Sequence, residues 1–331
     1  MDFKAQHILQ LHQSQSFNFE EATLALFRYQ AQHNEVYREY LHHLRVDAEQ
    51  VKSLEEIPFL PIEFFKTHRV VTGAFEPEVI FYSSGTTQST RSQHLVSNLA
   101  WYEQTSRQIF EKFYGSLQDY TVLALLPSYL EQGGSSLVAM VDYFIKQTGQ
   151  QAEGFYLHNH DLLLQALRQA KQHQKKVLLM GVSYALLDLA DKLNGQEDLS
   201  GVTVMETGGM KGRRKEMIRE ELHAQLQKGL GVTEIHSEYG MTELLSQGYS
   251  FGNGLFWPGF SMRILLRDLN DPFQVSTSSR TGGINVIDLA NVDSCAFIET
   301  KDIGKLYPDG SFEVLGRFDN SDIRGCNLLV S

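Results

Sequence analysis

The sequence has 331 residues, of which 42% are hydrophobic and 21% charged, a composition that suits a globular protein with a sizeable core. Its formal net charge is −11, so the chain repels phosphate backbones, and nucleic acid is excluded as an expected partner. The only two cysteines, Cys295 and Cys326, are too few for a disulfide framework or a cysteine-rich zinc site, and they fit a reducing compartment.

No secretory or membrane segment is expected from the sequence. The N-terminal stretch lacks the basic start and the apolar run of a signal peptide. The longest apolar runs, such as residues 121–127, are far too short to span a bilayer. We therefore expect a cytoplasmic protein without a membrane span.

The first part of the chain is predicted to be helical, because apolar side chains recur at the spacing of one helix face over residues 36–44. Two prolines in residues 57–65 (IPFLPIEFF) then favour an extended segment. Residues 79–82 form a predicted short strand that enters a loop rich in Ser, Thr and Gly. Residues 95–115 are the next candidate helix.

Predicted strands and helices alternate through the middle of the chain. The strand candidates cover residues 121–127, 176–181, 202–209 and 231–240, and the helix candidates cover residues 135–149, 161–173 (capped by Asp161), 183–193 and 213–228 (with Ile218, Leu222 and Leu226 on one face). This alternation predicts a mostly parallel sheet with helices on both faces, in which ligands bind at the carboxyl ends of the strands. From about Gly252, short strands between turns predict a small antiparallel β subdomain.

The loop Ser83–Arg91 (SSGTTQSTR) is the first candidate site for chemistry. Successive N–H groups and hydroxyls after a strand can cradle phosphate, and Arg91 supplies a positive charge at the far end. The loop is not a Walker loop, because the Gly-Lys-Ser/Thr ending is absent. Taken alone, the loop favours the simpler interpretation, a Ser/Thr-rich surface turn.

Two further candidates lie downstream. In the segment His236–Leu244 (HSEYGMTEL), Tyr239 can stack on a purine, Thr242 can reach a phosphate, and Glu243 can hold Mg²⁺. The alternative is a packed tyrosine followed by a Thr-Glu helix cap. In the third candidate, Asp302 and Arg317 could hold a ribose together, or could belong to ordinary turns of a β subdomain.

The order of these motifs resembles that of the adenylate-forming superfamily, which includes acyl-CoA synthetases, firefly-type luciferases and peptide-synthetase adenylation domains. The resemblance runs from roughly Phe59 onward. It implies an α/β fold: the large N-terminal-type domain of these enzymes, with mostly parallel sheets flanked by helices and a small β subdomain. The expected division is a catalytic domain over residues 1–316, with a helical lead-in to about 57, α/β subdomains to about 250 and a β-rich part thereafter. Residues 317–331 would be a hinge-like arm in place of the family's small C-terminal domain.

The resemblance also implies a role for each matching residue. The phosphate loop is matched by Ser83, Ser84, Gly85, Thr86 and Thr87, with Arg91 at the family's lysine position, although the family's Gly and Pro are replaced by Gln88 and Thr90. The nucleoside site is matched by Gly208 and Gly209 at the adenine wall, Tyr239 with Gly240 at the stacking position, Asp302 at the ribose and Arg317 beside it. The remaining matches are Thr242 at the α-phosphate, Glu243 at Mg²⁺ and Asp319 at the hinge. ATP and Mg²⁺ are therefore the expected cofactors.

Within the superfamily, the chain resembles the LuxE-type acyl-protein synthetases of bacterial fatty acid reductase systems. The shared features are the IPFLP lead-in, FFK (Phe64–Lys66), SSGTT, EYGMTEL and the closing LGRFDNSDIRGCNLLV. In that family a cysteine near the C-terminus takes the acyl group as a thioester and passes it to a reductase. Cys326 stands at the matching position, Arg324 nearby favours its thiolate, and the alternative is a small apolar residue packed with its neighbours.

The resemblance therefore implies ATP-dependent activation of a fatty or other carboxylic acid, with transfer to Cys326 and then to a protein resembling an acyl-CoA reductase or an acyltransferase. Two alternatives remain open at this point. One is a CoA ligase for an aryl or short-chain acid. The other is a non-catalytic subunit that binds nucleotide or acyl groups as a scaffold.

Overall fold

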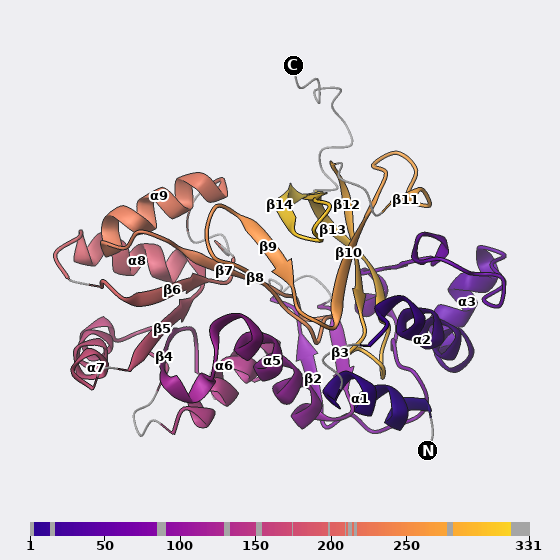
Figure 1. Ribbon diagram of the computed structural model, residues 1–331, viewed down its shortest axis with the longest axis horizontal. Helices are drawn as coiled ribbons and strands as arrows, with labels where there is room; N and C mark the ends of the chain where they lie inside the picture. Colours follow the sequence, from indigo (N-terminus) through magenta and orange to yellow (C-terminus); the bar gives the residue numbers. More distant parts are fainter. Residues whose placement is uncertain are drawn as a thin grey trace.

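The computed structural model describes residues 3–13, 17–84, 91–128, 133–149, 154–173, 175–197, 199–208, 210, 214, 217–276 and 281–318. Helices and strands alternate in the middle of the chain, and strands dominate after residue 236 (Figure 1). The helices are α1 (Phe3–Gln13), α2 (Phe19–His33), α3 (Glu35–His43), α4 (Phe64–Thr67), α5 (Leu99–Tyr114), α6 (Ser136–Gln147), α7 (His160–Gln172), α8 (Ser183–Leu193) and α9 (Arg219–Leu230). None of these helices combines the length and the apolar character needed to cross a membrane.

The strands among the described residues form one large sheet and one hairpin. The hairpin pairs β2 (Val79–Tyr82) with β3 (Gln93–Val96). The strands of the large sheet are β1 (Leu60–Pro61), β4 (Tyr120–Leu125), β5 (Lys176–Gly181), β6 (Val202–Glu206), β7 (His236–Tyr239), β8 (Gly248–Ser250), β9 (Leu255–Pro258), β10 (Met262–Arg267), β11 (Val275–Ser276), β12 (Thr281–Asp288), β13 (Phe297–Leu306) and β14 (Phe312–Arg317).

The large sheet changes from parallel to antiparallel at β7. Strands β4, β5, β6 and β7 pair in parallel, as expected where helices connect successive strands. From β7 the order continues through β8, β9, β14, β13, β12, β10 and β11, and these neighbours are antiparallel. The α/β part and the β-rich part of the chain therefore share one hydrogen-bonded sheet.

Most of the helices begin at a polar N-cap residue, whose side chain accepts a hydrogen bond from a backbone N–H in the first turn. Asn98 Oδ1 accepts from Trp101 N at 3.0 Å and caps the start of α5. The helix predicted from residue 95 therefore begins later, because Leu95 and Val96 belong to β3. Asn159 Oδ1 accepts from Leu162 N at 3.0 Å and begins α7. The prediction that Asp161 caps this helix is therefore wrong. The Asp161 carboxylate instead pairs with Lys192 Nζ at 2.7 Å.

The predicted helix 213–228 begins later than its periodicity indicates. Ile218 is the residue before α9 and is 68% exposed, whereas Leu222 and Leu226 are buried as expected. The first residue of α9 is Arg219. Its guanidinium lies over the Phe256 ring at 4.8 Å and donates to the Val314 carbonyl at 3.2 Å. The helix start is therefore set by a contact with distant strands, which the local pattern does not contain.

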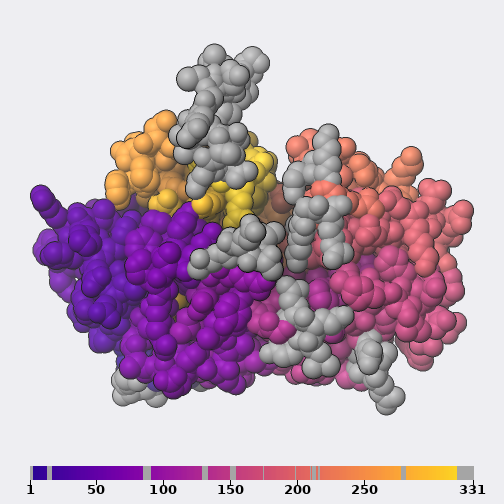
Figure 2. All heavy atoms as spheres, turned by 180° about the vertical axis from the view of Figure 1, so that it is seen from behind, coloured from indigo at the N-terminus to yellow at the C-terminus, as the bar shows by residue number. Residues whose placement is uncertain are grey.

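The N-terminal helices pack on the β-rich half of the sheet. The Phe27 ring of α2 and the Tyr37 ring of α3 lie 5.7 and 5.9 Å from the ring of Phe297 on β13. Strand β1 pairs in parallel with β13, so the extended segment predicted at residues 57–65 is anchored there in part. Seen from behind, the indigo N-terminal part and the orange and yellow strands fill one half of the molecule, and the pink part around α7 and α8 fills the other (Figure 2).

Candidate functional site

The candidate site is a polar pocket of about 490 Å³ at the carboxyl ends of β2, β6 and β7. This is the edge at which ligands bind in open α/β sheets. Seven of the predicted site residues line it: Ser83, Ser84, Gly208, Gly240, Thr242, Glu243 and Arg317. Motifs that lie far apart in the sequence are therefore brought together around one cavity.

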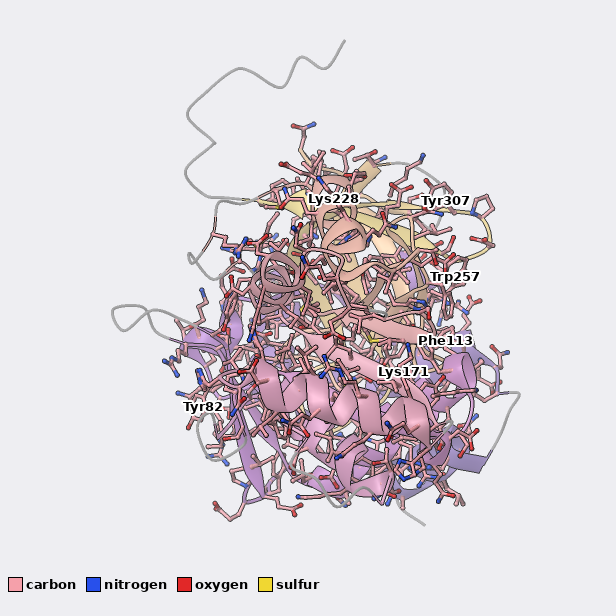
Figure 3. All side chains as sticks on the ribbon, turned by 90° about the vertical axis from the view of Figure 1, so that its left-hand side faces the viewer. Tyr82, Phe113, Lys171, Lys228, Trp257 and Tyr307 are labelled. Atoms are coloured by element: carbon pink, nitrogen blue, oxygen red, sulfur yellow. The ribbon has the colours of Figure 1, made fainter. Side chains whose placement is uncertain are left out.

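The β2–β3 hairpin presents the start of the Ser/Thr loop to the pocket. Ser83 N donates to the Ser92 carbonyl at 3.1 Å, and Ser92 N donates to Ser83 Oγ at 2.9 Å, which fixes the point where the loop leaves the hairpin. Tyr82, at the end of β2, is 39% exposed and lies at the rim of the molecule (Figure 3). Arg91 is exposed and is not one of the pocket residues. Gly85, Thr86 and Thr87 lie outside the described residues.

Tyr239, Asp302 and Arg317 form a connected set. Tyr239 donates from its hydroxyl to Asp302 Oδ2 at 2.9 Å, and Arg317 Nε lies 3.6 Å from Asp302 Oδ1. Asp302 and Arg317 face each other across the β13–β14 ladder, so the antiparallel register brings two residues fifteen positions apart side by side. Burial raises the pKa of Asp302, and the Arg317 charge opposes that rise.

The Tyr239 ring packs against aromatic side chains of the neighbouring strands. It lies 5.3 Å from the Phe312 ring and 6.0 Å from the Phe256 ring, and only 8% of the residue is exposed. Burial raises the pKa of Tyr239 well above its ordinary value, so the phenol stays protonated and can donate to Asp302. Tyr239 therefore contacts Asp302 and is not part of the pocket lining, and its stacking on adenine stays a prediction.

The Thr242–Glu243 segment is held from behind by His94 and Asn291. His94 Nδ1 lies 2.8 Å from the Thr242 carbonyl oxygen, and His94 Nε2 lies 3.0 Å from Asn291 Oδ1. Asn291 Nδ2 donates to the Glu243 carbonyl at 2.8 Å. Shortly after Glu243, the backbone N–H groups of Leu245 and Ser246 donate to Asp288 Oδ2. These contacts fix the backbone, so the side chains of Thr242 and Glu243 are oriented before any ligand arrives.

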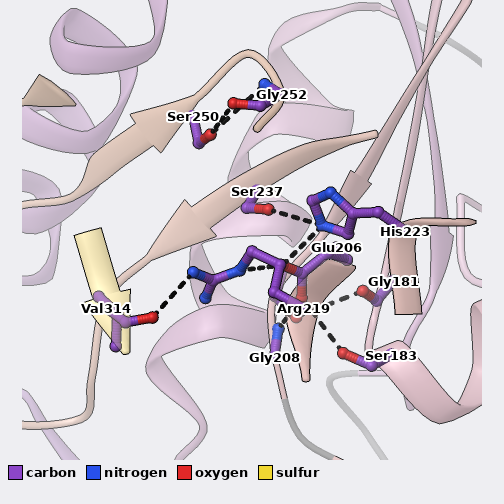
Figure 4. Close-up of polar contacts among 11 residues, drawn as sticks. Gly181, Ser183, Glu206, Gly208, Arg219, His223, Ser237, Ser250, Gly252 and Val314 are labelled. Atoms are coloured by element: carbon purple, nitrogen blue, oxygen red, sulfur yellow. Dashed lines mark hydrogen bonds and ion pairs between the residues drawn. The ribbon is translucent and has the colours of Figure 1, made fainter. Parts of the chain in front are cut away.

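A buried carboxylate organises the turn after β6. Glu206 Oε2 accepts from Gly208 N at 2.7 Å and from Ser183 Oγ at 3.2 Å. Arg219 Nε and His223 Nε2 lie 3.8 and 3.7 Å from Glu206 Oε1 (Figure 4). Burial raises the pKa of Glu206, but its hydrogen bonds and the Arg219 charge outweigh burial, and the net effect lowers the pKa.

Glu206 was not among the predicted site residues. The signal that could have identified it is a carboxylate that ends a buried strand immediately before the Thr-Gly-Gly turn. Gly208 adopts φ of 74°, a conformation that favours glycine, and it lines the pocket. Gly209 lies outside the described residues.

The pocket also contains charged and polar residues that sequence reasoning did not select: Glu63, Lys66, Glu238, Gln247 and Lys301. Lys301 Nζ pairs with Glu63 Oε1 at 2.5 Å, whereas no ion-pair or hydrogen-bond partner of the Lys66 ammonium group is found among the described residues. Lys66 contributes a positive potential at Glu243 that lowers its pKa, against a larger rise from burial. Lys66 belongs to FFK and Glu238 to EYG, so both stood inside motifs already recognised.

Two further residues of the sequence analysis lie outside the pocket lining. Cys295 is fully buried in the core, and burial raises the pKa of its thiol to about 12, which disfavours the reactive thiolate. His236 Nδ1 lies 3.0 Å from the Tyr114 hydroxyl oxygen. Asp319 and Cys326 lie outside the described residues.

Comparison with known proteins supports this description. The family model of the LuxE acyl-protein synthetases matches residues 3–113, which include the hairpin of the Ser/Thr loop. No curated protein matches the chain. The ATP-bound MatB from Rhodopseudomonas palustris superposes with a TM-score of 0.55 and 16% identity over 74% of this chain and 49% of its own. An open conformation of 2-hydroxyisobutyryl-CoA ligase, in complex with 2-HIB-AMP and CoA, superposes with a TM-score of 0.64 and 13% identity over 91% of this chain and 74% of its own.

The predicted resemblance to LuxE-type synthetases and adenylate-forming ligases is therefore confirmed, as is the predicted α/β fold class. The chain spans about half the length of MatB. The domain boundaries and the role of each site residue stay predictions.

Proposed function

We propose that this protein activates a carboxylic acid with ATP to form an acyl-adenylate and pyrophosphate. The observation that carries the proposal is the pocket at the strand ends, where Ser83, Thr242, Glu243 and Arg317 meet around one cavity. The match to the LuxE family model and the fold shared with adenylate-forming ligases support the same reading.

The described residues suggest how ATP would lie. Asp302, already oriented by Tyr239 and Arg317, offers its carboxylate to the ribose hydroxyls. The Gly208 turn offers a close backbone approach to adenine, since it carries no side chain. Ser83 and Ser84 line the pocket and would contact the β- and γ-phosphates, and Thr242, also in the lining, would contact the α-phosphate. The sequence resemblance adds Gly85, Thr86, Thr87 and Arg91 to the proposed phosphate contacts.

In the adenylation step, a carboxylate oxygen of the acid attacks the α-phosphorus of ATP. The bond from that phosphorus to the bridging oxygen breaks, and pyrophosphate leaves with the electron pair. The reaction concentrates negative charge, so catalysis depends on fixed donors and cations rather than on a protein nucleophile. Lys66, Lys301 and Arg317 line the pocket and can offset this charge.

Glu243 fits the expected Mg²⁺. Mg²⁺ bound with a nucleotide commonly uses one or two protein carboxylates together with phosphate oxygens and water. Glu243 supplies one buried carboxylate at the pocket wall, and burial raises its pKa, so a bound cation would favour the charged form. When bound, the ion would neutralise part of the phosphate charge.

We extend the proposal to a second step, in which the Cys326 thiolate attacks the acyl carbonyl carbon. The bond between the acyl carbon and the AMP oxygen breaks, AMP leaves, and a thioester remains. The LuxE family match over residues 3–113 supports a fatty acid as substrate and a reductase as final acceptor. The thioester step and the pivot at Asp319 rest on the resemblance of the sequence around these two residues.

Acid-dependent exchange of labelled pyrophosphate into ATP tests the first step. A panel of fatty, short-chain and aryl acids should contain at least one acid that supports exchange, and Thr242→Ala should reduce it by about a hundredfold, as for loss of one transition-state donor. Exchange with none of the acids would favour a binding scaffold and contradict the proposal.

The same preparation tests the second step. With ATP, Mg²⁺ and the labelled acid, the wild-type protein should carry hydroxylamine-labile label, and Cys326→Ser should carry none while keeping exchange. Equal labelling of Cys326→Ser would remove Cys326 as the acceptor. Release of AMP only when CoA is added would favour a CoA ligase, the activity named for the neighbour of known structure.

A further inference from the structure

The pocket lining includes two polar side chains, Glu238 and Gln247, that have no role in the proposed adenylation step. Glu238 and Gln247 both line the cavity, one from β7 and one from the residue before β8. Glu238 faces Tyr249 across the β7–β8 ladder, and residues opposite each other in an antiparallel pair project to the same face. Gln247 lies two residues before Tyr249, so its side chain belongs to that face as well.

Both side chains present hydrogen-bond acceptors that the protein leaves unused. Gln247 is 3% exposed, its Nε2 donates to the Leu245 carbonyl at 3.3 Å, and its Oε1 has no hydrogen-bond partner among the described residues. Nor does the Glu238 carboxyl have a hydrogen-bond or ion-pair partner in the described part of the chain. Leaving such groups unpaired costs free energy, about 1–3 kcal/mol for a buried polar atom.

Glu238 belongs to the pocket lining, so a ligand in the cavity can reach its carboxyl. A Cβ at Gly240 would lie 2.4 Å from Glu238 Oε1, so the carboxyl occupies space that the glycine leaves open. The pocket lining also includes aromatic and apolar side chains, among them Tyr102, Leu137, Met140 and Val182. Burial, together with the negative charge of Glu206, raises the pKa of Glu238 to about 8.

We infer that the acid bound here carries a hydrogen-bond donor, a hydroxyl or an ammonium group, that Glu238 and Gln247 recognise. This inference rests on the proposed function and narrows its substrate class. An unsubstituted acyl chain would leave Gln247 Oε1 and the Glu238 carboxyl unpaired after expelling water. A site built to hydrogen-bond a substrate group discriminates strongly against an analogue that lacks it.

The test uses pyrophosphate exchange with matched acids: unsubstituted chains of increasing length, the same chains with a hydroxyl at successive carbons, and the same chains with an ammonium group. At least one donor-bearing acid should exceed the unsubstituted acid of equal length by tenfold or more in kcat/KM. Gln247→Leu should remove most of that ratio. Glu234→Gln, an exposed carboxylate near the start of β7, is the matched control and should keep it.

Glu238→Gln distinguishes the two donors, since loss of the carboxylate should weaken an ammonium-bearing acid far more than a hydroxyl-bearing one. An unsubstituted acid as good as every donor-bearing acid in the wild type would overturn the inference, because water alone would then satisfy these groups.

A second measurement keeps the inference independent of catalysis. If no acid supports exchange, the proposed function fails, and calorimetric titration of the same acids into wild type and Gln247→Leu decides the inference. Binding of a donor-bearing acid that the variant loses would support it, and absence of binding of any acid to the wild type would overturn it. Thermal unfolding of each variant verifies that it is folded.

Discussion

Lys66 offers a charge that the rest of the pocket does not neutralise, because it lines the cavity and no partner of its ammonium group is found among the described residues. A cation in that position is expected to act on the phosphates of the nucleotide. Lys66→Met should therefore lower kcat/KM for ATP in the exchange assay by roughly tenfold to a hundredfold, since charge-assisted hydrogen bonds contribute about 1.5–3 kcal/mol. Lys66→Arg should recover part of this loss, whereas Lys4→Met, far along the chain at the Asp293 carboxylate, should have no effect. Equal activity of Lys66→Met and wild type would show that the phosphates lie elsewhere.

Strand β3 pairs with β2 and also carries His94, which contacts the Thr242–Glu243 segment. Its His94 contacts the Thr242 carbonyl oxygen and Asn291, and so connects the hairpin of the phosphate loop to the segment that carries Glu243. The neutral His94 ring has one N–H, so His94→Leu leaves one buried acceptor unpaired, and it should reduce the free energy of unfolding by about 1–3 kcal/mol in urea titrations. It should also lower kcat in the exchange assay, with a smaller change in the KM of ATP. His94→Gln, which can keep one hydrogen bond, should recover part of kcat. A loss of stability with unchanged kcat would limit His94 to a structural role.

For the whole molecule, the pocket carboxyl of Glu238 makes stability depend on pH. Its folded-state pKa of about 8 is above the ordinary value of 4.5, so the folded protein holds this proton more tightly than the unfolded chain. The contribution of Glu238 to the free energy of unfolding is therefore full below about pH 4.5 and is lost as the pH rises through about 8. The decline should approach, at most, about 1.4 kcal/mol per pH unit. Urea unfolding between about pH 5 and pH 9 should show a shallower decline for Glu238→Gln than for wild type or Glu234→Gln. Identical slopes would place Glu238 in a more polar environment.

Local patterns in the sequence predicted much of this fold. The strands at residues 79–82 and 176–181 lie where the apolar runs indicated, because both are short and bounded by polar or glycine residues. The Asp302–Arg317 pair was expected from the motif series, and the β13–β14 register now provides its geometry. The predicted gathering of the motifs around a pocket follows from strand ends that share one edge of a sheet.

The missed features depend on contacts between distant segments. Arg219 at the start of α9 contacts Phe256 and Val314 on distant strands. The apolar periodicity wrongly placed Ile218 inside the helix, because it contains no information about these contacts. Gln247 has no local signature, since its significance comes from an unpaired oxygen atom that only the folded pocket reveals. Glu238 lies inside the EYG motif, but the motif does not show that its carboxyl lines the pocket. The polar acceptors of the acid site were therefore beyond what spacing alone could predict.

The short parallel pairing of β1 with β13 has a consequence for how the protein is made. Leu60 pairs with Ile298, so the segment that carries Glu63 and Lys66 finds its place only when a strand from the far end of the sequence is available. During synthesis at about 5–20 residues per second, Ile298 is added roughly ten to fifty seconds after Leu60. The hairpin and the parallel strands can fold in that interval, but the pocket cannot close. We therefore expect the nucleotide site of the nascent chain to form late in synthesis. Incomplete nascent chains would then not bind ATP.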